Sequence, residues 1–327
     1  MSFRAMLLTH NDDRSISADL TDLNHDDLMD GDVLVRVAYS SLNYKDGLAV
    51  TGKGKVIRNF PMIPGIDFVG TVEESASEDY QPGDQVILTG WGVGEKHYGG
   101  YAQYARVQSE WLVPLPEKLS PQHAMAMGTA GLTAMLAVRA QEVHGLQPEH
   151  GDILVTGASG GTGSMAIAIL GGWGYNVVAS TGRAEEADYL RSLGANEVIG
   201  RLDSPGRPLE SGRWGAVVDG VGGATLASAL AATKYGGCVA AYGLAGGTEL
   251  NTTVLPFILR GIKLHGIDSV MAPFEKRKDA WMRLALDVPT EKLDTITQVV
   301  PLSEIRPYCD DILAGKVRGR IVVDVNG

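Results

Sequence analysis

A glycine-rich stretch near the middle of the chain constrains its fold more than any other feature. Residues Val155 to Ser164 read Val-Thr-Gly-Ala-Ser-Gly-Gly-Thr-Gly-Ser, after the apolar run Asp152–Val155 and before the helix-like run Met165–Leu170. Strand, glycine turn and helix in this order present free backbone N–H groups and the positive end of a helix to a pyrophosphate. Glycine is needed where the backbone turns sharply, because a Cβ would clash there. The residues that we expect to contact the phosphates are Ser159, Gly160, Gly161, Thr162 and Gly163.

The pattern of apolar residues changes near residue 123. Before it, short apolar runs alternate with Gly- and Pro-containing turns, which is typical of a compact, mainly antiparallel β domain. The runs are Phe3–Thr9, Val33–Ser40, Phe68–Glu73, Gln85–Leu88 and Tyr101–Val107. After residue 123, predicted strands alternate with Ala- and Leu-rich helical segments, which indicates a doubly wound parallel sheet. The predicted strands of this sheet are Ile153–Thr156, Asn176–Ser180, Glu197–Ile199, Ala216–Asp219, Cys238–Tyr242 and Leu264–Ile267.

The tail of the chain, Gly319–Val325, predicts one more strand, which we expect to return to the first domain. The sequence therefore predicts an α/β protein with a Rossmann-type domain at residues 123–270. The other domain is discontinuous and consists of residues 1–122 with 271–327.

Composition narrows the class of protein. With 327 residues, two domains are expected, and the net charge of −11 with a pI near 5.1 argues against nucleic acid or an anionic membrane as partner. No apolar run has membrane-spanning length and no signal-peptide core follows Met1, so we expect a cytoplasmic protein. Cys238 and Cys309 are isolated, so no disulfide framework is predicted, and Cys238 is interpreted as a small core residue.

The end of the second strand of the parallel sheet indicates which nucleotide binds. In NAD-binding sheets an acidic residue about 20 positions beyond the glycine turn binds the ribose hydroxyls. Here the segment is Ser180-Thr181-Gly182-Arg183, which has two hydroxyls and a guanidinium but no acid. A guanidinium can pair with a 2′-phosphate through charge-assisted bonds, so we predict NADPH and assign Arg183 to its phosphate. Arg201 is a second candidate for the same phosphate, and for both arginines a solvated loop position is the alternative.

A β domain, a cofactor domain and a returning strand resemble the medium-chain dehydrogenase/reductases. Zinc-dependent members carry a Cys in an early loop and a Gly-His-Glu motif after a proline. The corresponding segments here are Ser40–Asp46 and Phe60–Asp67, where no cysteine is present and Ile66 occupies the histidine position. Because a catalytic zinc needs about three protein ligands, no metal is predicted. A zinc-free member is suited to hydride addition to an electron-poor C=C bond.

Further stretches are similar to the bacterial NADPH-dependent acrylyl-CoA reductases. They are Ser41–Asp46, Thr51–Lys55, Arg58–Phe68, Leu88–Glu95, Gly128–Gly131, Tyr235–Ala240 and Gly266–Met271. The resemblance implies reduction of acryloyl-CoA to propanoyl-CoA, a GroES-like catalytic domain and a homodimer. It also implies that Asn43 and Tyr44 lie in the loop that replaces the metal loop, where Tyr44 contacts the cofactor and donates a hydrogen bond or a proton. The alternative for Tyr44 is an aromatic side chain that only shapes the pocket, with water supplying the proton.

Other cofactor contacts follow from position in the fold, because doubly wound sheets bind ligands at the carboxyl ends of their strands. Leu244 and Ser269 follow the fifth and sixth strands, and Thr129 precedes the main part of a long predicted helix. Ile258 and Asn326 are assigned to the cofactor on the resemblance alone. A basic cluster, which we define as Lys53, Lys55 and Arg58, is assigned to the phosphates of coenzyme A, with a solvated surface as the alternative.

Two rival functions remain open at this stage. One is a quinone reductase that uses the same hydride geometry on a small flat acceptor or activated alkene. The other is a non-enzymatic NADPH-binding or sensing protein, against which the polar segment Asn43–Asp46 argues.

Overall fold

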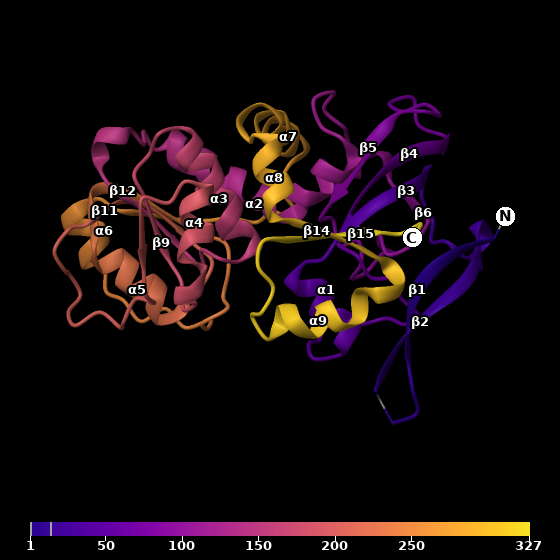
Figure 1. The fold of residues 1–327 in the computed structure, drawn as a ribbon, viewed down its shortest axis with the longest axis horizontal. Helices are drawn as coiled ribbons and strands as arrows, with labels where there is room; N and C mark the ends of the chain where they lie inside the picture. Colours follow the sequence, from indigo (N-terminus) through magenta and orange to yellow (C-terminus); the bar gives the residue numbers. More distant parts are fainter. Residues whose placement is uncertain (1, 14) are drawn as a thin grey trace. The chain divides into compact units, whose positions relative to one another are not determined.

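The computed structural model describes residues 2–13 and 15–327 (Figure 1). The chain forms two compact units: unit 1 comprises Met1–Thr129, Val270–Ala285 and Leu293–Gly327, and unit 2 comprises Ala130–Ser269 and Leu286–Lys292. The first division lies inside helix α2 (Pro121–Val143), where Gly128 has non-helical angles (φ 51°, ψ −151°) and breaks the helix. It therefore lies later than the change of pattern near residue 123, because the first turns of this helix belong to unit 1.

Unit 2 contains a six-stranded parallel sheet. Its strands are β8 (Ile153–Thr156), β9 (Val177–Ser180), β10 (Glu197–Ile199), β11 (Trp214–Asp219), β12 (Thr233–Ala241) and β13 (Lys263–Gly266). The order β10-β9-β8-β11-β12-β13 is the strand order of dinucleotide-binding sheets. Strands β8, β9 and β11 are buried along their whole length, which explains why their residues are continuously apolar rather than alternating. The predicted doubly wound sheet is confirmed.

Helices cover both faces of this sheet, as expected where the strand order reverses between β8 and β11. They are α3 (Gly161–Gly172), α4 (Ala187–Leu193), α5 (Gly223–Ala231) and α6 (Leu255–Arg260) (Figure 1). Helix α3 is buried from Gly163 to Leu170, which accounts for its Ala, Ile and Gly composition. Between the sheet and α5 lies a core that contains Leu154, Val217, Leu230 and Val239.

Unit 1 is built around a seven-stranded sheet of order β14-β15-β3-β4-β5-β7, with β6 paired to β3, and a separate β1–β2 hairpin. The strands are β1 (Ser2–His10), β2 (Ile16–Asn24), β3 (Val33–Ser41), β4 (Asp67–Ser75), β5 (Gln85–Thr89), β6 (Tyr104–Val107), β7 (Leu112–Pro114), β14 (Thr297–Pro301) and β15 (Arg320–Asp324). All of these pairs are antiparallel except β14–β15. Because β15 pairs with β3, the end of the chain lies in the same sheet as its beginning.

The remaining helices are α1 (Tyr44–Thr51), α7 (Phe274–Asp287), α8 (Thr290–Ile296) and α9 (Ile305–Leu313). Short 3₁₀ helices lie at His25–Asp27, Ser109–Trp111, Pro148–His150, Ala184–Glu186 and Leu302–Glu304. Helix α1 corrects the prediction of a loop at residues 43–46: Asn43 is its N-cap and Tyr44 its first residue. Within the part of the chain that the structure describes, no helix combines the length and apolarity needed to span a bilayer.

Candidate active site

The glycine turn between β8 and α3 has the geometry of a phosphate-binding turn. Strand β8 ends at Thr156, Gly157 takes a positive φ of 59°, and α3 begins at Gly161. A Cβ on Gly163 would lie 2.5 Å from the carbonyl oxygen of Gly157, so only glycine allows the helix to start this close to the turn. The first N–H groups of α3 are therefore held at the carboxyl edge of the sheet, where the helix end favours an anion.

Two hydroxyls and a guanidinium join the ends of β8 and β9. The Ser159 and Thr181 hydroxyl oxygens are 3.0 Å apart. Arg183 donates from Nε to the Ser159 hydroxyl at 3.2 Å and from Nη2 to the Ser159 carbonyl at 3.1 Å. Its backbone N–H donates to the Thr181 hydroxyl at 3.1 Å. Three residues predicted separately from the sequence thus form one hydrogen-bonded group beside the glycine turn.

A second guanidinium lies against the same segment. The side chain of Arg201 packs on Gly182 so closely that a Cβ at position 182 would overlap its Nε atom. Glu186 provides a counter-charge to Arg183, with 3.7 Å between Glu186 Oε1 and Arg183 Nη1. Ser180 is not part of this group, because its hydroxyl donates to the Gly200 carbonyl at 2.9 Å across the sheet. The arrangement of Arg183 and Arg201 suits a phosphate monoester better than a bare ribose, because planar guanidinium groups match phosphate geometry.

The carboxyl ends of β12 and β13 border a cavity of about 410 Å³. Its lining residues are Ala241, Tyr242, Gly243, Leu244, Gly266, Ile267 and Asp268. Leu244 is 65% exposed and offers an apolar surface there. The Ser269 hydroxyl accepts a hydrogen bond from Thr133 at 2.8 Å. Ile258, also predicted to contact the cofactor, lies on α6 and is exposed, but it is not among the residues that line this cavity.

In unit 1, the segments compared with the metal-binding loops meet at a buried carboxylate, Asp67. Its Oδ1 accepts from the backbone N–H and hydroxyl of Ser41, at 3.1 and 2.8 Å. Its Oδ2 accepts from Asn43 Nδ2 at 3.0 Å and from the backbone N–H of Thr129 at 2.8 Å. Asn43 also donates to the Ser41 hydroxyl at 3.2 Å, so both hydrogens of its amide are engaged. Asn43 is therefore held inside this network rather than presented to a ligand.

Arg320 completes the network from β15. Its Nη2 donates to the Ser41 hydroxyl at 2.7 Å and to Asn43 Oδ1 at 3.4 Å, and its Nε donates to the Ala126 carbonyl at 2.9 Å. Arg320 is 4% exposed and Asp67 is fully buried, so the network buries a positive and a negative side chain together. Gly128 packs directly on the cluster: a Cβ there would lie 2.8 Å from Asp67 Oδ2.

Asp46, one turn into α1, is a second buried carboxyl group. It accepts the backbone N–H of Asn43 at 2.9 Å and that of Ile66 at 3.0 Å. Burial, and then the neighbouring Asp67, raise the pKa of Asp46 to about 7. Tyr44, in contrast, is 53% exposed at the start of α1 and is available to a ligand.

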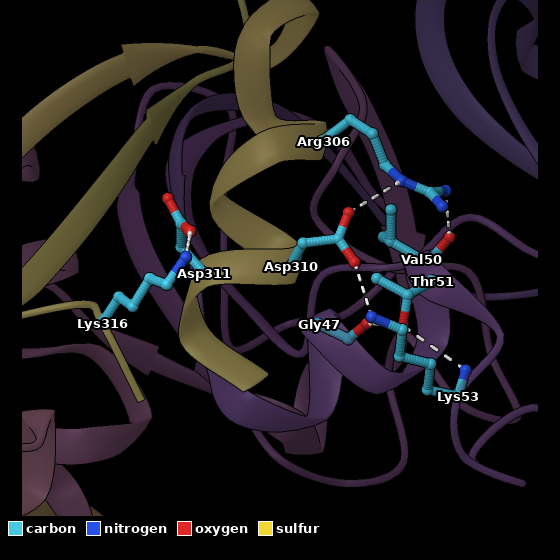
Figure 2. A network of polar contacts seen from close by, with 8 residues as sticks. All are labelled: Gly47, Val50, Thr51, Lys53, Arg306, Asp310, Asp311 and Lys316. Atoms are coloured by element: carbon cyan, nitrogen blue, oxygen red, sulfur yellow. Dashed lines mark hydrogen bonds and ion pairs between the residues drawn. The ribbon is translucent and has the colours of Figure 1, made fainter. Parts of the chain in front are cut away.

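One of the three cations of the basic cluster, Lys53, forms an ion pair within the protein. Lys53 Nζ lies 2.8 Å from Asp310 Oδ1, and Arg306 approaches the same carboxylate from the other side, with its Nε 3.9 Å from Oδ2 (Figure 2). Arg306 also donates to the Val50 carbonyl at 2.6 Å, so α9 is tied to the end of α1. Lys53 therefore already pairs with a carboxylate, while Lys55 and Arg58 are exposed, and the assignment of the cluster to coenzyme A stays a prediction.

Asn326 lies beyond the end of β15 rather than inside the terminal strand. Its amide donates to the carbonyls of Val37 and Ala38, at 3.2 and 3.4 Å, and accepts from Gln103 at 3.4 Å. Val37 and Ala38 lie in β3, well before Asn43, which follows the end of that strand. The assignment of Asn326 to the cofactor stays a prediction that rests on the resemblance.

Comparisons with known proteins decide the family. The alcohol dehydrogenase GroES-like domain model matches residues 29–117, and the zinc-binding dehydrogenase model matches residues 161–285. The chain is 53% identical over 328 residues to the acrylyl-CoA reductase AcuI of Ruegeria pomeroyi, with 99% of each chain covered. The chain belongs to the medium-chain dehydrogenase/reductase family.

Solved structures agree with this assignment. The crystal structure of Escherichia coli YhdH with bound NADPH matches this medium-chain reductase with a TM-score of 0.96 at 51% identity, covering 98% of this chain and 100% of the other. Bacillus subtilis YhfP, whose name is that of a quinone oxidoreductase, is 46% identical over 325 residues, with 98% of each chain covered. The crystal structure of YhfP holds NAD and matches with a TM-score of 0.96.

One of the two matching family models is the zinc-binding dehydrogenase model, but the residues of this medium-chain reductase do not fit a catalytic zinc ion. Ile66 offers no ligand atom, and the amide of Asn43 is engaged by Asp67, Ser41 and Arg320. Arg320 brings a positive charge into the same cluster, where it would repel a metal dication. Among the described residues there is also no group of three or more His, Cys, Asp or Glu side chains placed to hold a metal.

Sequence reasoning missed Asp67, Arg320 and Asp46 as residues of this site. Asp46 and Asp67 lie in the two segments that resemble the metal loops, so an acidic residue in each segment could have indicated that both belong to the site. Arg320 could not be found in the same way, because only the pairing of β15 with β3 brings it to Ser41.

Proposed function

We propose that this chain reduces the C=C bond of acryloyl-CoA to give propanoyl-CoA, with NADPH as the reductant and without a metal. The observation that carries the proposal is the likeness over nearly the full chain to an acrylyl-CoA reductase, at 53% identity. The guanidinium groups of Arg183 and Arg201 support the choice of NADPH, since an acidic residue is absent from the segment Ser180–Arg183.

We assign the cofactor contacts to two sets of residues. The pyrophosphate is assigned to the turn at Ser159–Gly163, and the 2′-phosphate to Arg183 and Arg201 with the Thr181 hydroxyl and the Gly182 backbone. Ser180 has a supporting role, because its hydroxyl holds the strand end against Gly200. The nicotinamide end is assigned to Leu244, Ile258, Ser269, Thr129, Tyr44 and Asn326.

Bound NADPH supplies a hydride from its nicotinamide C4 to the β-carbon of the enoyl thioester, and a proton then completes the α-carbon. The protein must hold the two reactants in line and stabilise the negative charge that develops on the thioester oxygen. We assign a hydrogen bond to that oxygen, or delivery of the proton, to the exposed hydroxyl of Tyr44. Asn43 acts indirectly, as the N-cap that sets where α1 and Tyr44 begin.

The basic cluster is proposed to bind the phosphates of coenzyme A. Lys55 and Arg58 are exposed, and Lys53 can exchange its contact with Asp310 for a phosphate oxygen. A local positive patch on a chain of net charge −11 can steer an anion toward its site.

A quinone reductase activity is the second candidate, favoured by the name of YhfP. The test measures NADPH and NADH consumption with acryloyl-CoA, crotonyl-CoA and a panel of small quinones. The proposal predicts high kcat/KM for acryloyl-CoA alone, with NADPH preferred to NADH. A higher kcat/KM for quinones would overturn it in favour of the second candidate. NADPH binding without turnover of any acceptor would favour a non-enzymatic role.

We also propose a cytoplasmic homodimer. Strand β13 is an edge strand of the parallel sheet and is exposed along its length. Exposed apolar side chains lie nearby in sequence, at Val254 and Leu259, and a second copy would cover them. Both cysteines are free, which suits a reducing compartment. Analytical ultracentrifugation should give a dimer, and Leu259→Glu should give a monomer; a monomeric wild-type chain would overturn the assignment.

A further inference from the structure

Three chain segments that are far apart in the sequence end on the single carboxylate of Asp67. They are the end of β3 at Ser41, the residue before α1 at Asn43, and the residue after the kink of α2 at Thr129. Every one of these groups donates a hydrogen to the carboxylate. An ionised carboxylate is the side chain that can accept all of them at once, because it carries two acceptor oxygens and no hydrogen.

Two of these segments carry residues that contact the reactants in the proposed function. Tyr44 follows Asn43 directly and is the first residue of α1. The Asn43–Asp67 hydrogen bond therefore fixes the position of the backbone from which the Tyr44 side chain extends. Thr129 is bound through its own backbone N–H, at 2.8 Å. A shift of the Asp67 carboxylate would therefore move both segments together.

Two further groups hold the carboxylate itself in place. Arg320 reaches it through the shared Ser41 hydroxyl, and Gly128 packs against it, since a Cβ there would lie 2.8 Å from Asp67 Oδ2. The positive φ of Gly128, 51°, kinks α2 there, and the N–H of Thr129 donates to Asp67. The side chains of Asp67 and Arg320 are both buried, so solvent does not compete for these bonds.

We propose that Asp67, anchored by Arg320, is a positioning residue for the reduction: it sets the Asn43–Tyr44 and Gly128–Thr129 segments in the geometry that hydride transfer needs. This inference rests on the proposed function for the identity of the substrate. Asp67 touches neither substrate nor cofactor in this account, and it acts through the groups that it holds. A displacement of about 1 Å in such segments is enough to lower a rate by about a hundredfold.

The test compares Asp67→Asn with a matched change, Asp32→Asn, in the same unit. Asp32 also accepts a backbone N–H and a hydroxyl, both from Ser109, at 2.6 and 2.7 Å, but it has no bond to Asn43 or Thr129. In Asp67→Asn one of the two acceptor oxygens becomes an NH₂ group, which faces hydrogen-bond donors in either orientation of the amide. We expect kcat with acryloyl-CoA to fall by about tenfold to a hundredfold. Because the assigned phosphate contacts of NADPH lie in unit 2, its dissociation constant should change by less than about threefold in Asp67→Asn. The control Asp32→Asn should leave kcat unchanged.

Hydrogen exchange provides a readout that does not depend on turnover. Asp67→Asn should speed exchange in peptides that cover residues 41–48 and 126–132, and Asp32→Asn should not. If Asp67→Asn fails to fold, Ser41→Ala replaces it, because it removes the hydroxyl that joins Asp67 to Arg320, with the same expected split between kcat and NADPH affinity.

An unchanged kcat, or a fall in kcat matched by an equal loss of NADPH affinity and by a general rise in exchange, would overturn the inference. A wild-type protein that does not reduce acryloyl-CoA would refute the proposed function instead. In that case faster exchange confined to the two peptides would still support the positioning role, and unchanged exchange there would overturn it.

Discussion

Replacing Arg183 by Ala tests the assignment of the cofactor phosphate. The guanidinium lies beside the glycine turn and is held by Ser159 through Nε and Nη2, which leaves Nη1 facing Glu186 at 3.7 Å. Its side chain is 22% exposed, so a phosphate bound here would be only partly screened by water. A charge-assisted hydrogen bond of this kind contributes about 2 kcal/mol, which corresponds to about a thirtyfold change in affinity.

Arg183→Ala should therefore raise the KM for NADPH by about thirtyfold and change the KM for NADH by less than about twofold. Steady-state kinetics with both cofactors measures this, with Arg191→Ala as control, because Arg191 is an exposed arginine of the same unit that pairs with Asp188. Equal KM values before and after the change would refute the assignment. So would an equal loss for both cofactors, since that would mean that Arg183 only holds Ser159 in place.

Three further predictions concern the substrate, the kink and the buried acid. Reversing all three charges of the basic cluster should raise the KM for acryloyl-CoA by at least about tenfold, and an unchanged KM would refute the CoA assignment; Lys316→Glu, on an exposed pair with Asp311, is the control. Gly128→Ala should lower the free energy of unfolding in urea by about 3 kcal/mol. Gly83→Ala, where φ is 100° and nothing lies within 4 Å, should cost about 1 kcal/mol; equal losses would contradict the contact with Asp67. Because burial raises the pKa of Asp46 from 3.8 to about 7, the native state binds the extra proton between these values and loses stability as pH rises through them. The free energy of unfolding of Asp46→Asn, relative to the wild-type chain, should therefore rise by about 3 kcal/mol from pH 5 to pH 8, and a parallel pH dependence of the two would contradict the shift.

Strands β8, β9 and β11 of the parallel sheet could be predicted because burial on both faces makes them continuously apolar. Strand β8, for example, was placed at its observed bounds, Ile153–Thr156. Strand β2 was missed because its residues are partly exposed and mix Asp and Ser with Leu, which hides any alternation. Helix α1 was missed because it is short and starts from polar residues whose partners, such as Ile66 for Asp46, are distant in the chain.

The same distinction applies to the site. Ser159, Thr181 and Arg183 could be predicted because strand–turn–helix geometry fixes where they stand. The Asp67 network could not be, because it depends on which strands of the antiparallel sheet become neighbours, and composition does not specify that. The ion pair between Lys53 and Asp310 could not be predicted either, because only the tertiary fold brings α9 next to α1.

The central claim is that a hydride passes from NADPH to the β-carbon of acryloyl-CoA. The most direct measurement uses NADPH carrying two deuterium atoms at nicotinamide C4 and locates the label in the product by mass spectrometry and NMR. The account predicts propanoyl-CoA with one deuterium at C3 and none at C2, formed in equal amount to the NADPH consumed. Label at C2, unlabelled product, or NADPH consumption without propanoyl-CoA would contradict it.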